Sequence, residues 1–114
     1  MNFHSLYDQG FTRVAAVTLP VHPAQPLANA EEIIAAAKSC DERGVSIALF
    51  PELCVSGYAI DDLLLQDVLL DEVEHALTTI IAASADLLPL IVVGAPLRKE
   101  AALYNCAVAI HRGR

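Results

Sequence analysis

The chain has 114 residues, of which 55% are hydrophobic and 18% charged, with 14 acidic against 7 basic side chains and a formal net charge of −7. This composition is too apolar for a disordered segment and suits one small domain. The acidic balance argues against nucleic-acid binding, which depends on cations that neutralise phosphates. Because no apolar run is long enough to span a bilayer, we expect no membrane partner.

The cysteine count and the N-terminal residues together indicate a compartment. Three cysteines without a CxxC spacing argue against a disulfide framework and fit reduced thiols. The first twenty residues show no basic segment ahead of a long apolar one, so we expect no signal peptide. These features predict a cytoplasmic protein.

Extended and helical patterns alternate in the first half of the chain. Residues 14–19 are a short apolar run and predict a strand buried on both faces. Asn29 and Glu32 have the spacing of a capping box and predict the start of a helix, which Gly44 ends. Residues 45–50 predict a second buried strand, so these elements form a βαβ unit.

The second half continues the alternation. Residues 61–86 have helical periodicity, with a break expected near Gln66. Residues 90–93 predict a third strand that ends in a turn at 94–96, and residues 103–110 predict a fourth strand. The fold class is therefore α/β, in the order β-α-β-α-β-β.

The last residues suggest that the fold is incomplete. The fourth strand runs into residues 111–114, where Gly113 would open a turn into a further strand. We expect a fragment of a longer domain, the alternative being a frayed natural terminus after an edge strand.

Several well-known site motifs are missing from the sequence. There is no GxGxxG, P-loop or GxSxG motif, and the four histidines are scattered without HExxH spacing. We therefore expect no metal site and no cofactor bound by this segment.

Glu52 is the candidate general base. It follows an apolar strand and Pro51, which fixes the direction of the chain. A carboxylate placed there would lie against an apolar interior, and burial would disfavour its charged form, as base catalysis requires. The alternative is a glutamate that caps a loop or pairs with a surface cation.

The cysteines and Tyr58 have less specific patterns. Cys54 lies close to Glu52 in sequence, but a buried core thiol explains it better than a Cys–Glu pair. Cys40 and Cys106 fall on apolar faces of predicted elements and are expected in the core. Tyr58 either covers a pocket or packs as an ordinary tyrosine.

Two groups of residues carry a family resemblance over essentially the whole chain. Phe-Pro-Glu-Leu at 50–53 and Ser-Gly-Tyr at 56–58 resemble the first catalytic motif of the nitrilase, or carbon–nitrogen hydrolase, superfamily. The further segments resemble, more narrowly, the glutamine-dependent NAD synthetases: residues 3–16, 61–66, 92–98, 103–105 and 111–113.

This resemblance implies that residues 1–114 are the N-terminal portion of a glutaminase domain with a nitrilase-type α-β-β-α sandwich. Half of such a sandwich would expose sheet edge and an apolar face, so we also expect a homo-oligomer. The family hydrolyses the glutamine amide with a Glu–Lys–Cys triad, of which Glu52 matches the glutamate. The lysine and the nucleophilic cysteine would lie beyond residue 114, so the chain alone is expected to be inactive. Tyr58 is the candidate substrate-binding residue for glutamine.

The resemblance also implies a second part of the enzyme. Ammonia released from glutamine would pass to a synthetase domain, which uses ATP and magnesium to convert nicotinic acid adenine dinucleotide into NAD. Two alternatives remain open: another carbon–nitrogen hydrolase acting on a small amide or carbamoyl compound, or a non-catalytic interaction module with the same half-fold.

Overall fold

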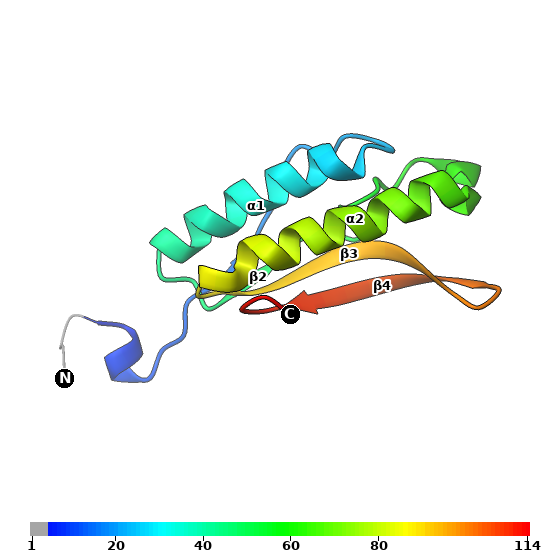
Figure 1. Ribbon diagram of the computed structural model, residues 1–114. Coiled ribbons are helices and arrows are strands. Elements are labelled where there is room, and N and C mark those ends of the chain that lie inside the picture. The colour runs from blue at the N-terminus through cyan, green and yellow to red at the C-terminus, as the bar shows by residue number, and fades with distance from the viewer. Residues whose placement is uncertain (1–4) are drawn as a thin grey trace.

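The computed structural model describes residues 5–114, so residues 3 and 4 of the N-terminal resemblance lie outside the described residues. Two helices and three short 3₁₀ helices alternate with four strands along the chain (Figure 1). The elements are η1 (Tyr7–Gln9), β1 (Val14–Ala16), α1 (Pro26–Glu42), β2 (Ile47–Leu49), η2 (Asp61–Leu65), α2 (Asp67–Ala83), η3 (Ser84–Asp86), β3 (Leu90–Lys99) and β4 (Ala102–Ile110).

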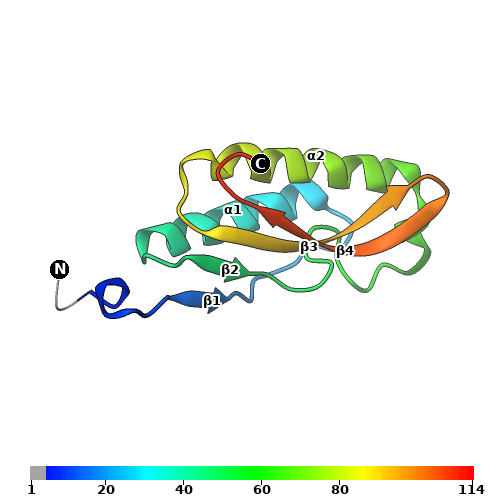
Figure 2. The ribbon, with the colours of Figure 1, turned by 90° about the horizontal axis from the view of Figure 1, so that it is seen from below.

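The four strands form one sheet in the order β1-β2-β3-β4. The first three strands are parallel, and β4 runs antiparallel to β3 as a long hairpin. Both helices lie on the same face of this sheet, as the views along and beneath it show (Figures 1 and 2). The expected β-α-β-α-β-β order and α/β class are confirmed.

The core lies between the sheet and the two helices. One row of side chains crosses the sheet on its helix-covered face, pairing Ala48 of β2 with Ile91 of β3 and Ile91 with Ile110 of β4. Ile33 of α1 and Val73 of α2 belong to the same buried cluster. Their burial away from water is the main favourable contribution to folding.

The opposite face of the sheet is open. Side chains of the short strands alternate between the core and this face, where Val14 is 62% exposed, Leu49 53% and Ile47 40%. The prediction that the first two strands are buried on both faces is therefore wrong for the described chain, which has helices on one face only. This arrangement is one sheet and one helical layer, which is half of an α-β-β-α sandwich.

Asn29 does not cap α1 and instead lies inside it. The helix begins earlier, at Pro26, where a proline at the first position has no unsatisfied N–H. The Asn29 side chain is buried, accepts a hydrogen bond from the His22 N–H (2.6 Å), and donates to the carbonyls of His22 (2.8 Å) and Val55 (2.9 Å). It therefore joins the loop before α1 to the loop after β2.

The other predicted boundaries agree in part. Gly44 ends α1 with a φ of 68°, and the break at Gln66 separates η2 from α2, both as predicted. The turn predicted at 94–96 is wrong, because β3 continues to Lys99 in register with β4. Pro96 is tolerated there because β2 stops opposite Val92, which leaves β3 one neighbour beyond that point.

We expect Asn29→Ala to lower the free energy of unfolding by about 1–3 kcal/mol, because it leaves buried backbone groups of two loops without partners. Urea unfolding measures this loss. Gln25→Ala is the matched control, since Gln25 is exposed and its substitution should change stability by less than about 0.5 kcal/mol. Equal losses in the two variants would contradict the role of the Asn29 side chain.

Candidate active site

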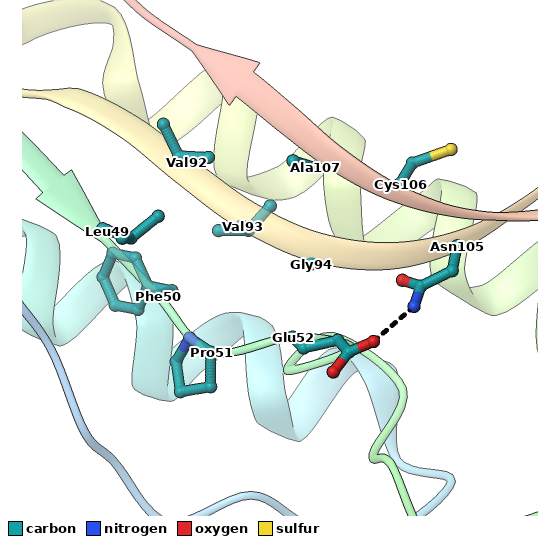
Figure 3. Close-up of a pocket in the computed structure, with 10 residues that line it drawn as sticks. All are labelled: Leu49, Phe50, Pro51, Glu52, Val92, Val93, Gly94, Asn105, Cys106 and Ala107. Carbon is teal, nitrogen blue, oxygen red and sulfur yellow. Dashed lines mark hydrogen bonds between the residues drawn. The ribbon is translucent and has the colours of Figure 1, made fainter.

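A hollow of about 250 Å³ opens on the uncovered face of the sheet, at the carboxyl end of β2 (Figure 3). Leu49 and Val92 contribute apolar side chains to it, and Glu52 and Asn105 contribute the polar ones. The carboxyl edge of parallel strands is where open α/β sheets build their sites. The sequence placed Glu52 at this edge correctly.

Glu52 is hydrogen-bonded to an amide in this hollow. Asn105 Nδ2 on β4 donates to Glu52 Oε1 at 2.5 Å (Figure 3). The Glu52 side chain is exposed, so the apolar interior expected around it is not provided by the described residues. No ion pair found among residues 5–114 involves Glu52, which argues against the alternative of a surface salt bridge.

Gly94 allows the Glu52 loop to lie directly on β3. A Cβ at Gly94 would stand 2.3 Å from Leu53 N, 2.8 Å from the Pro51 carbonyl oxygen and 2.9 Å from the Glu52 carbonyl carbon. Each distance is shorter than a van der Waals contact, so only glycine fits. The Val55 N–H also donates to the Gly94 carbonyl at 3.1 Å, which fixes the loop against the strand.

A tight turn brings the chain back after Glu52. Leu53 has a φ of +51°, an uncommon conformation for a residue with a side chain, and its carbonyl accepts the N–H groups of Ser56 (3.2 Å) and Gly57 (2.8 Å). Gly57 has a φ of +98° and lies against the Pro23 backbone. The carbonyl of buried Ser56 accepts a hydrogen bond from the Ala24 N–H. Such backbone strain persists only where the surroundings hold it in place.

Cys54 and Cys40 show no sign of nucleophilic activation. Cys54 is 2% exposed with its sulfur 3.9 Å from the Gly94 carbonyl oxygen, and burial raises the pKa of its thiol. Burial also raises the pKa of the Cys40 thiol, with Arg43 acting in the opposite direction. The prediction that both are core residues is confirmed, whereas Cys106 is only half-buried. A nucleophile needs the opposite setting, in which the thiolate is stabilised.

Tyr58 lies apart from the hollow. It is 68% exposed at the end of the same loop and is not among the side chains that line the hollow. The structure therefore brings Glu52 together with Asn105 but not with Tyr58, whose role in substrate binding stays a prediction. Sequence reasoning missed Asn105, although an amide among the small and apolar residues of 102–110 was a signal that could have found it.

No group of three or more His, Cys, Asp or Glu side chains within residues 5–114 is placed to hold a metal ion. No helix of the described residues is long and apolar enough to cross a membrane.

Gly94→Ala should displace the Glu52 loop and destabilise the fold by about 1–3 kcal/mol, the usual cost of forcing extra volume into a packed site. Amide hydrogen exchange of residues 52–57 should accelerate beyond the global effect. Gly44→Ala is the control, because no atom lies within 4 Å of its Cβ position and only its positive φ is strained. Unchanged exchange at 52–57 in Gly94→Ala would refute the close approach.

Comparison with known proteins identifies the family and the relatives that this chain resembles. Residues 13–114 match the family described as carbon–nitrogen hydrolase. The chain is 54% identical over 113 residues to the glutamine-dependent NAD(+) synthetase of Mycobacterium tuberculosis (strain H37Rv), covering 99% of this chain and 17% of that protein. It is 43% identical over 83 residues to the synthetase of the same name from Xanthomonas campestris, covering 73% of this chain and 14% of the relative.

Solved structures agree with the sequence comparison. The crystal structure of a glutamine-dependent NAD(+) synthetase from Cytophaga hutchinsonii matches with a TM-score of 0.81 and 26% identity, over 90% of this chain and 17% of that one. The Acinetobacter baumannii enzyme in complex with ADP matches with a TM-score of 0.73 and 26% identity, over 84% and 18% of the two chains. The chain spans about a sixth of the length of the relatives it matches.

Proposed function

The chain belongs to the carbon–nitrogen hydrolase family, and from that premise we propose that it is part of a glutaminase domain that supplies ammonia for NAD synthesis. The observation that carries the proposal is the position of Glu52, at the carboxyl end of β2 and on the wall of the hollow. The curated relatives described above are named glutamine-dependent NAD(+) synthetases, which favours this function over hydrolysis of another small amide.

In the proposed reaction Glu52 acts as the general base. It takes the proton of a cysteine thiol, whose sulfur attacks the side-chain amide carbon of glutamine. The proton passes to the departing nitrogen, which leaves as ammonia, and a thioester remains. Glu52 then takes a proton from the water that attacks the thioester and gives it to the departing sulfur, which releases glutamate and restores the thiol. Proton transfer by a positioned side chain contributes about 10²–10⁴-fold to such rates.

The lysine and the cysteine of this reaction are assigned to chain beyond residue 114. Lys38 and Lys99 are the lysines of this segment, and both are exposed outside the hollow. Cys40 and Cys54 are buried core residues, and the half-buried Cys106 turns its side chain away from Glu52 (Figure 3). The segment by itself is therefore expected to leave glutamine intact.

The ammonia-consuming step belongs to a separate synthetase domain, which would bind ATP and magnesium and amidate nicotinic acid adenine dinucleotide. Support comes from the names of the relatives and from the solved relative that contains ADP. No residue of the present segment is assigned to that step. The proposed location is the cytoplasm, and Tyr58 is proposed to cover the bound glutamine with its exposed ring.

In the full-length protein, Glu52→Gln should abolish ammonia release from glutamine, because an amide cannot accept the thiol proton. The same variant should still make NAD from ammonium salts. Cys54→Ala should lower stability by about 1–2 kcal/mol through lost packing and leave turnover of glutamine within a few-fold. Steady-state assays with glutamine and with ammonium distinguish the two variants. An inactive Cys54→Ala beside a fully active Glu52→Gln would overturn the assignment.

Residues 1–114 alone should self-associate through the open sheet face, because its exposed Val14, Ile47 and Leu49 form an apolar surface. Sedimentation velocity at micromolar concentration should show dimers or larger species. Val14→Asp should shift the population towards monomer. Val68→Asp is the matched control, since Val68 is 72% exposed on α2, away from the sheet. A wild-type chain that sediments as a stable monomer would disprove this association.

A further inference from the structure

We propose that Asn105 is the positioning residue of the glutaminase site and holds the Glu52 carboxylate so that Oε2 is the oxygen that accepts the proton. This inference rests on the proposed function of Glu52. The observation behind it is the hydrogen bond from Asn105 Nδ2 to Glu52 Oε1 at 2.5 Å. Figure 3 shows Oε1 joined to the amide and the second oxygen turned away from it.

The hairpin register sets the position of Asn105. Asn105 pairs with Pro96, and Ala107 pairs with Gly94, on which the Glu52 loop rests. Residues two apart on a strand project from the same face. Asn105 and the loop thus share the open face, and the register brings the amide to the end of the Glu52 side chain.

The chemistry of the two side chains determines that Asn105 donates the hydrogen bond and Glu52 accepts it. A carboxylate accepts hydrogen bonds only, and an asparagine amide can donate only through Nδ2. Among the residues of 5–114 that line the hollow, only Glu52 and Asn105 have a charged, amide or hydroxyl side chain. The cross-strand partner of Asn105, Pro96, and the next residue on the same face of β4, Ala107, carry no donor in their side chains. Cys106 also lines the described hollow, but Figure 3 shows its side chain turned away from Glu52.

Orientation matters because the Glu52 side chain is long and exposed. Gly94 fixes the backbone from which the side chain starts, and without a second anchor the carboxyl group would sample several rotamers. The bond to Asn105 supplies that anchor at the far end. It occupies Oε1 and leaves Oε2 free for the thiol proton.

The test uses the full-length protein with Asn105→Ala and Asn105→Asp. The aspartate keeps the shape of asparagine but places an acceptor against an acceptor. For both variants we expect kcat with glutamine to fall about 10–100-fold, as misplacement of a reacting group does, with KM changed less than about twofold. NAD synthesis from ammonium salts and the melting temperature should stay at wild-type values. Tyr104→Phe, at the preceding position of β4, is the control with unchanged kcat.

The outcomes separate this inference from the proposed function. Wild-type kcat in Asn105→Asp shows that donation is not needed and overturns the inference, as long as Glu52→Gln is inactive. A parallel loss of glutamine turnover, ammonium turnover and melting temperature also overturns it, because Asn105 would then only hold the fold together. Full glutamine turnover by Glu52→Gln instead overturns the proposed function itself.

Discussion

The candidate site depends on one steric constraint, the contact between the backbone of residues 51–53 and Gly94. Gly94 lies on β3 in register with Ala107 of β4, so the sheet itself provides the surface on which the loop rests. With no Cβ at this position, the loop comes within hydrogen-bonding distance of the strand and the Val55 N–H reaches the Gly94 carbonyl. Glu52 thereby becomes a fixed extension of β2 rather than the tip of a mobile loop.

The other side of the same loop is held by the helical layer. The Asn29 amide, buried on α1, bonds to the Val55 carbonyl, and the Ser56 carbonyl bonds to the N–H of Ala24 in the loop before the helix. These contacts hold Leu53 in its left-handed conformation, which costs about 1–3 kcal/mol on its own. The loop is thus held between strand and helix, and the carboxylate emerges on the open face.

The sequence predicted the features that depend on local pattern. Apolar periodicity predicted the order of strands and helices, and Gly44 predicted the end of α1. Pro51 and the strand before it predicted the position of Glu52. The failures involve contacts between distant parts of the chain. Asn29 has the local pattern of a helix cap, but its partners lie 7 and 26 residues away.

The prediction of a turn at residues 94–96 failed for the same reason. Residues 94–96 have the composition of a turn, yet pairing with β4 keeps them extended. That pairing also determines that Asn105 faces Glu52, so the error over the turn and the failure to find Asn105 have a common origin.

The open face of the sheet affects the strength of the contacts in the hollow. In the proposed sandwich a second layer would cover Leu49 and Val92 and exclude water from the hollow. Removing water strengthens each remaining polar contact, so the Asn105–Glu52 bond would restrict the carboxylate more tightly there than in the exposed segment.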